Sequence, residues 1–194
     1  MTKKSVKKIA NQSILIGKSK QETFEELRET CSLSEKELAK IIQKIPSVEA
    51  KKKYKILHLT LKIILILTIL LKMRMGILLI IDEEIQSIHQ IILILLILPL
   101  INILLLIGVA KYRPSSFKLV AIFMIIGLYQ YMRSGIVFEE EGALIFIDLA
   151  IHVVLFVLGL HLYSKFFPKY LTVKEIHQDS QGEVEYRNVI KFED

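Results

Sequence analysis

Residues 91–110 read IILILLILPLINILLLIGVA, a run of twenty residues without a charged side chain. The hydrocarbon core of a bilayer is about 30 Å thick, and a helix of about 20 apolar residues spans it. This segment therefore predicts a transmembrane helix. Its only strongly hydrogen-bonding side chain is that of Asn102, which is a candidate for a polar contact inside the membrane.

The composition extends this interpretation to the whole chain. Hydrophobic residues make up 53% of the 194 residues, while 24% are charged and the formal net charge is +6. A soluble domain of this size cannot bury that much apolar surface in one core. The single cysteine, Cys31, also excludes a disulfide framework and a cysteine-cluster metal site. We therefore expect an all-α integral membrane protein with a four-transmembrane-helix bundle.

Three further apolar blocks complete this bundle. The predicted membrane domain covers residues 54–164, with spans at about 56–74, 91–110, 117–133 and 143–163. The first block is the least regular, because it contains Lys62 and because Lys72 and Arg74 interrupt its continuation. A charge at the bilayer centre costs about 3 kcal/mol. We therefore place Lys72 and Arg74 at the far interface and expect residues 76–82 to lie on the membrane surface or to dip into it.

The first 53 residues form a basic segment. Between Met1 and Lys55 there are 14 Lys and Arg residues against 7 Glu residues. Two capping boxes, each a hydroxyl followed three residues later by a carboxylate, predict two short helices in this segment. The first helix is expected at residues 20–30, with Ser19 and Glu22 as its capping box. The second is expected at residues 35–44, with Ser34 and Glu37 as its capping box.

The C-terminal tail, residues 165–194, predicts a β-hairpin. Branched residues from Leu171 to Ile176 are followed by a turn signal at residues 179–182 and a second alternating run. An isolated hairpin is marginally stable, and residues 13–16 could add a third strand to it. The two ends of the chain would then form one small cytoplasmic lobe. Two independent tails are the alternative.

Basic residues next to the apolar blocks predict the orientation, because short cytoplasmic loops are rich in Lys and Arg. The basic residues expected to contact the inner leaflet or a partner are Lys51, Lys52, Lys53, Lys111 and Arg113. The other two loops hold the acidic runs 82–84 and 139–141. The prediction is a multi-pass protein of the cytoplasmic or inner membrane with both termini in the cytoplasm.

Polar residues inside the predicted spans are the candidate site. Asp148 and His152 lie four residues apart and share a helix face, and Tyr129, Gln130 and Asn102 are the further members of this polar intramembrane cluster. A carboxylate inside the bilayer is costly unless it is paired or hydrated. The cluster therefore indicates either an ion or proton pathway or a hydrogen-bonded clasp between helices.

No residue pattern indicates catalysis. The sequence lacks H-E-x-x-H, G-x-S-x-G and G-x-G-x-x-G motifs, so we expect no enzyme, no metal and no cofactor. Lipid head-group chemistry at His58 and His161 is the enzymatic alternative. The basic segment also lacks the aromatic residues that stack on bases, which disfavours nucleic acid as a partner.

Two functions fit these features. The first is a membrane-embedded scaffold or regulatory subunit that presents its basic cytoplasmic lobe to a partner. The alternative is a small homo-oligomeric channel or membrane-permeabilising effector that uses Asp148, His152 and Asn102. The expected partners are the lipid bilayer together with further copies of the chain or a membrane or cytoplasmic protein.

Overall fold

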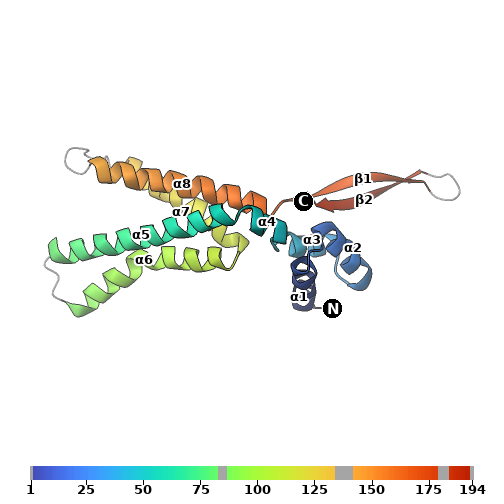
Figure 1. The fold of residues 1–194 in the computed structure, drawn as a ribbon, viewed down its shortest axis with the longest axis horizontal. Coiled ribbons are helices and arrows are strands. Elements are labelled where there is room, and N and C mark those ends of the chain that lie inside the picture. Colours follow the sequence, from blue (N-terminus) through green and yellow to red (C-terminus); the bar gives the residue numbers. More distant parts are fainter. Residues whose placement is uncertain (1, 83–86, 134–141, 179–183, 193–194) are drawn as a thin grey trace. The chain divides into compact units, whose positions relative to one another are not determined.

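A computed structural model describes residues 2–82, 87–133, 142–178 and 184–192 (Figure 1). The described chain is mostly helical and has one β-hairpin. It divides into two compact units. The terminal unit combines Met1–Lys53 with Ser164–Asp194, and the helical unit is Tyr54–Tyr163.

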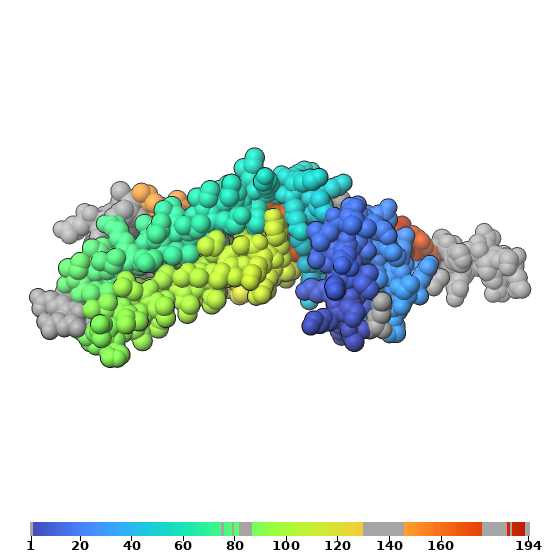
Figure 2. Space-filling view, turned by 60° about the horizontal axis from the view of Figure 1, so that its bottom comes forward, coloured from blue at the N-terminus to red at the C-terminus, as the bar shows by residue number. Residues whose placement is uncertain are grey.

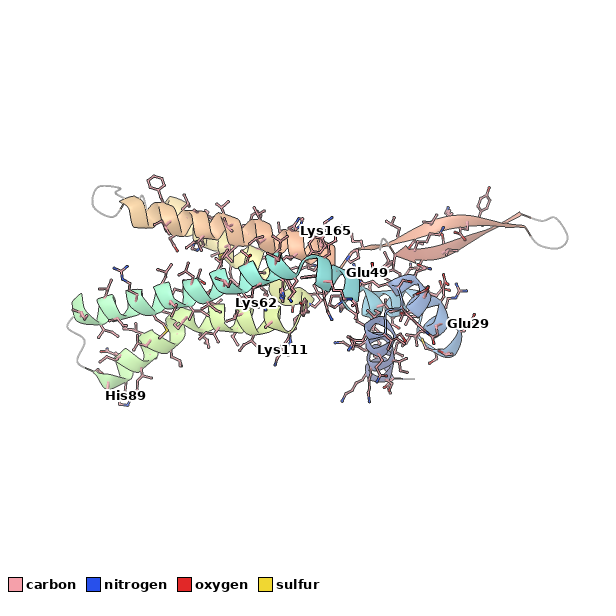
Figure 3. The ribbon with its side chains drawn as sticks, viewed as in Figure 1. Glu29, Glu49, Lys62, His89, Lys111 and Lys165 are labelled. Atoms are coloured by element: carbon pink, nitrogen blue, oxygen red, sulfur yellow. The ribbon has the colours of Figure 1, made fainter. Side chains whose placement is uncertain are left out.

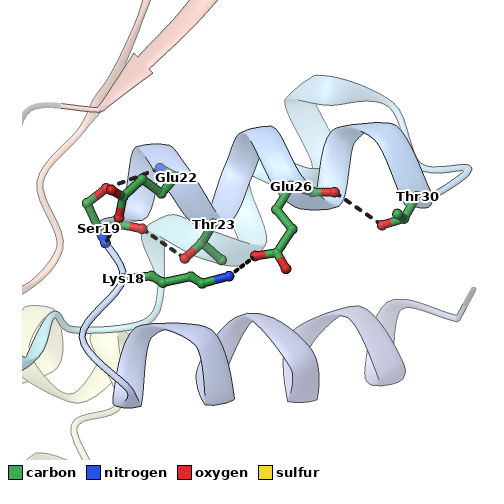
Figure 4. A network of polar contacts seen from close by, with 6 residues as sticks. All are labelled: Lys18, Ser19, Glu22, Thr23, Glu26 and Thr30. Carbon is green, nitrogen blue, oxygen red and sulfur yellow. Dashed lines mark hydrogen bonds and ion pairs between the residues drawn. The ribbon is translucent and has the colours of Figure 1, made fainter.

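Four helices precede the long apolar helices in the described chain. They are α1 (Lys3–Leu15), α2 (Lys20–Thr30), α3 (Glu35–Gln43) and α4 (Val48–Lys53). The capping box of α2 is complete, since the Ser19 hydroxyl accepts from the Glu22 amide and the Glu22 carboxylate accepts from the Ser19 amide (Figure 4). The Ser34 hydroxyl caps α3 by accepting from the Glu37 amide. The segment therefore holds more helices than the two that were predicted.

The prediction of a strand at residues 13–16 is wrong, because these residues end helix α1. Val6, Ala10 and Ile14 follow one another at intervals of four residues and are buried on one face of that helix. Burial of this face in a core with residues of α2, α3 and β2 outweighs the short branched run that suggested a strand. The helix ends before Gly17, whose φ of +100° suits a glycine.

The predicted hairpin is confirmed. Strands β1 (Tyr170–Gln178) and β2 (Val184–Phe192) pair antiparallel, with Tyr170 opposite Phe192 and Gln178 opposite Val184. The predicted turn at residues 179–182 lies outside the described residues. Within the described chain the sheet has these two strands alone, and helices cover its base instead of a third strand.

Both ends of the chain contribute to the core of the terminal unit. The Phe24 and Phe192 rings lie 5.9 Å apart, centroid to centroid, and the Phe192 amide donates to the Gln21 side-chain carbonyl over 3.1 Å. Ile190 is also buried in this core. The Lys20 ammonium, in a side chain that is 1% exposed, donates to the Phe166 carbonyl over 3.3 Å. The two ends are therefore one folded unit and not two independent tails.

The helical unit has four helices that run back and forth (Figure 1). They are α5 (Lys55–Asp82), α6 (Ile88–Ala110), α7 (Pro114–Arg133) and α8 (Gly142–Phe166). In the part of the chain that the structure describes, three segments are long and apolar enough to cross a membrane, namely Lys55–Leu78, Ile88–Ala110 and Phe146–Phe166. The corresponding apolar part of α7, Pro114–Tyr129, is shorter.

The first of these helices does not stop near residue 74, and its candidate span reaches Leu78. Helix α5 continues through Gly76, which lies directly under side chains of α6. A Cβ at Gly76 would lie 3.2 Å from Leu98 Cδ1 and 3.3 Å from Ile94 Cγ2. A glycine costs a helix about 1 kcal/mol relative to alanine, and this close packing offsets that cost.

Candidate functional site

One end of the helical unit gathers the start of α5, the turn between α6 and α7, and the end of α8. The buried His58 ring lies with its Nε2 3.0 Å from the Val109 carbonyl oxygen and its centroid 4.3 Å from that of Tyr112. On the other side, the Tyr54 and His161 rings meet edge to face at 5.9 Å. We call this end of the helical unit the basic end. It consists of these ring contacts and of the cations Lys111, Arg113 and Lys118.

The cations of the basic end lie at its surface. Lys111 and Arg113 are exposed in the turn after α6, and the Lys118 ammonium lies 4.6 Å from the centroid of the Tyr163 ring. Figure 3 shows Lys111 and Lys62 towards this end of the unit and His89 at the opposite end. A lysine beside a tyrosine is typical of a helix end at a membrane interface.

The other predicted basic residues belong to the terminal unit. Lys51, Lys52 and Lys53 form the last turn of α4. Lys52 and Lys53 are exposed, whereas Lys51 is half-buried and burial lowers its pKa. The five residues predicted to contact a leaflet or a partner are therefore divided between the two units.

Asn102 lies inside the helical unit, where it is 4% exposed. Its amide donates to the Thr68 hydroxyl of α5 over 3.1 Å, and that hydroxyl donates to the Leu65 carbonyl over 2.8 Å. Thr68 was not among the residues predicted for the site. Its only signal was a hydroxyl in an apolar helix, and such a hydroxyl commonly bonds to its own backbone.

Asp148 and His152 are neighbours on α8, as predicted from their spacing. The His152 Nδ1 atom lies 2.8 Å from the Asp148 carbonyl oxygen and 3.6 Å from the carboxylate Oδ2. The backbone contact is the hydrogen bond, because 3.6 Å is too long for one. The carboxylate is 30% exposed and the imidazole 12% exposed.

His152 also contacts a second helix at a glycine. A Cβ placed on Gly127 of α7 would lie 2.6 Å from His152 Cδ2 and 2.7 Å from Nε2. The imidazole therefore occupies the space that a side chain at Gly127 would need. This contact between α7 and α8 was not visible in the sequence, because a lone glycine in an apolar helix has many explanations.

The predicted polar cluster is therefore distributed over separate contacts. Asn102 bonds to α5, whereas His152 packs against α7. Tyr129 is 63% exposed, and the Gln130 side chain lies outside the described part of the structure. Among the described residues, no three His, Cys, Asp or Glu side chains are arranged to hold a metal ion.

Comparison with protein-family models, curated proteins and solved structures finds no significant match for this chain. Over its described residues, the fold defines a helical protein with three candidate membrane-spanning helices and a compact terminal unit.

Proposed function

We propose that this protein is a membrane-embedded scaffold or regulatory subunit that crosses the bilayer four times and presents its terminal unit in the cytoplasm. The observation that carries the proposal is the shared core of the two chain ends. Phe24 packs on Phe192, and Lys20 reaches the Phe166 carbonyl. This contact supports a location of the residues before the first candidate span and after the last one on the same side of the membrane.

This shared core supports an even number of crossings. Three crossings would leave residues 1–53 and 164–194 in different compartments, where Phe24 and Phe192 could not meet. Helix α7 supplies the fourth crossing. Its 20 residues rise about 30 Å at 1.5 Å per residue, which matches the hydrocarbon thickness.

The basic end supports a cytoplasmic location for the terminal unit. Lys111 and Arg113 lie in the short turn between α6 and α7, where positive residues favour the cytoplasmic side. The chain leaves the terminal unit at Lys53 and returns to it at Ser164. Tyr54 and His161, close to these two junctions, meet at the same basic end.

The contacts inside the helical unit favour an anchor over a channel. Asn102, His58 and His152 each bond within or between neighbouring helices of one chain. Such contacts stabilise membrane bundles by about 0.6–2 kcal/mol and need no water-filled axis. Outward positions are apolar in all four helices, for example Leu59, Leu96, Ile122 and Val157.

The topology is tested with an impermeant maleimide on sealed vesicles of known orientation. In the Cys31→Ser background, cysteines replace either Thr2 or Asn188, both of which are exposed. We expect both to react only from the cytoplasmic side. Reaction of the two cysteines from opposite sides would overturn the four-span proposal.

The scaffold role is tested by purification from native membranes in mild detergent. We expect a stable complex that is lost when Lys52 and Lys53 are both changed to Glu, and kept when the exposed Lys174 of β1 is changed to Glu. A chain that purifies alone would contradict the scaffold role. Ion flux through proteoliposomes that falls in Asp148→Asn would instead favour the channel.

A further inference from the structure

Helix α1 has one buried face and one exposed face with a distinct composition. Val6, Ala10 and Ile14 point into the core of the terminal unit. At 100° per residue, Lys4, Lys8 and Leu15 fall within about 40° of one another on the opposite side of the helix. All three are exposed, and Figure 2 shows α1, in dark blue, at the surface of the terminal unit.

The charge of this helix is unusual for its position. Its first two turns contain Lys3, Lys4, Lys7 and Lys8, and no acidic residue lies in its first turn. Cations near a helix N-terminus oppose the helix dipole, so this placement destabilises the helix locally. Lys3 is paired with Glu37 over 2.7 Å. A sequence that departs from a local rule in this way commonly does so at a functional surface.

The end of the same helix exposes two large apolar side chains. Leu15 is 54% exposed and Ile16 is 77% exposed, although the core of the unit lies on the other side of α1. A helix with lysines on its polar side and exposed apolar residues beside them has the composition of segments that lie in the membrane interface.

We propose that Lys4, Lys8, Leu15 and Ile16, together called the α1 surface, bind the anionic phospholipid headgroups of the adjacent leaflet. The lysines supply charge complementarity, and Leu15 with Ile16 enter the boundary between headgroups and acyl chains. The inference rests on the proposed membrane location, which keeps a bilayer within reach of the tethered unit. The competing partner of the α1 surface is α2 of a second copy of the chain, on the side that carries Glu25 and Glu29.

The test uses the full chain with an environment-sensitive fluorophore on a cysteine at Asn11, in the Cys31→Ser background. Asn11 is exposed on the same side of α1. The protein is reconstituted in vesicles of phosphatidylcholine alone or of phosphatidylcholine with phosphatidylglycerol. We expect a blue-shifted emission and protection from iodide quenching only in the anionic vesicles. High salt should abolish the protection, because it screens exposed charges.

Two matched variants separate the α1 surface from overall charge. Each lysine near an anionic surface favours binding about fivefold, so Lys4→Gln with Lys8→Gln should shift the equilibrium towards the free state by roughly twenty-five-fold. Lys36→Gln with Lys40→Gln removes the same charge from the exposed side of α3 and should leave the protection intact. Leu15→Ser with Ile16→Ser should weaken it.

Three results would overturn the proposal. They are equal quenching in both kinds of vesicle, an equal loss in the α3 variant, or a protection that rises with protein density and disappears in Glu25→Gln with Glu29→Gln. A second fluorophore at Asn188 separates these results from a failed topology. If the two labels are reached from opposite sides in every lipid, the four-span proposal fails and not lipid binding.

Discussion

The Asn102 side-chain amide of α6 donates a hydrogen bond to the Thr68 hydroxyl of α5, and both residues are buried, each 4% exposed. Inside a bilayer, water would not replace this bond if it were lost. The contact therefore ties two consecutive helices together at a position where the rest of the packing is non-directional. It is an interhelical hydrogen bond of the kind for which Asn102 was a candidate.

We expect Thr68→Val to destabilise the helical unit by about 1–2 kcal/mol, because Asn102 loses its acceptor. Unfolding in mixed micelles measures the change. Thr60→Val is the control, since the Thr60 hydroxyl donates to the Ile56 carbonyl of its own helix. If Thr68→Val and Asn102→Leu are additive when combined, the two side chains are not coupled.

We expect Gly127→Ala to destabilise the contact between α7 and α8 by about 1–3 kcal/mol, because the added methyl group overlaps the His152 ring. Adding His152→Ala should recover much of that loss. The comparison is Gly76→Ala, where the nearest side-chain atoms lie at 3.2 Å or more and need to shift by only a few tenths of an ångström, so its loss should be smaller. A loss that His152→Ala leaves unchanged would show that the imidazole is not the group displaced. Thermal unfolding in detergent measures all four proteins.

Phe192→Ala should loosen the N-terminal helices, although it lies at the other end of the chain. Loss of a buried phenyl ring costs about 3–5 kcal/mol, and Phe192 packs on Phe24. The half-buried Cys31 packs against the same core, so its rate of thiol labelling should rise. Tyr186→Ala, at a 68% exposed position of the same strand, should leave the rate unchanged. Equal rates in both variants would contradict a shared core.

The pKa of Glu22 should lie below its usual value of 4.5, because its carboxylate accepts from the Ser19 amide and hydroxyl. The pKa of Glu37 should also be low, because the Lys3 ammonium donates to it. Side-chain NMR titration measures both midpoints. We expect Lys3→Ala to raise the Glu37 midpoint and to leave that of Glu22 unchanged. A Glu37 midpoint that is unaffected by Lys3→Ala would contradict the ion pair between these two residues.

These lowered pKa values determine how the stability of the terminal unit changes with pH. The native state binds protons less tightly than the unfolded state, so both contacts contribute fully above about pH 4.5. Their contribution disappears as the pH falls through the lowered native values. The N-termini of α2 and α3 should therefore loosen in acid, which amide hydrogen exchange at Glu22 and Glu37 measures.

Features that depend on neighbouring residues could be predicted from the sequence. The apolar runs placed α6 and α8 within a few residues, because a long run without charge needs no partner to identify it. Ser19 and Glu22 predicted the start of α2, since a capping box is complete within four residues. The alternating run after residue 183 predicted β2 for the same reason.

Features that depend on distant residues could not be predicted. The run at residues 13–16 was mistaken for a strand, because the core that selects a helix there includes residues of α2, α3 and β2. Helix α5 continues through Gly76, and the α6 side chains that lie against this glycine could not be identified from the sequence. Thr68 and Gly127 could not be identified from the sequence, because their roles depend on contacts with Asn102 and His152 of neighbouring helices.

The sequence by itself determined that this chain has long apolar helices, a basic N-terminal segment and a C-terminal hairpin, because hydropathy, capping and alternation are local properties. Only the tertiary structure decided that residues at the two ends form one core, and that the polar residues of the helices meet partners on neighbouring helices. Those outcomes depend on packing between segments far apart in the chain, as between Phe24 and Phe192, and local patterns carry no information on it.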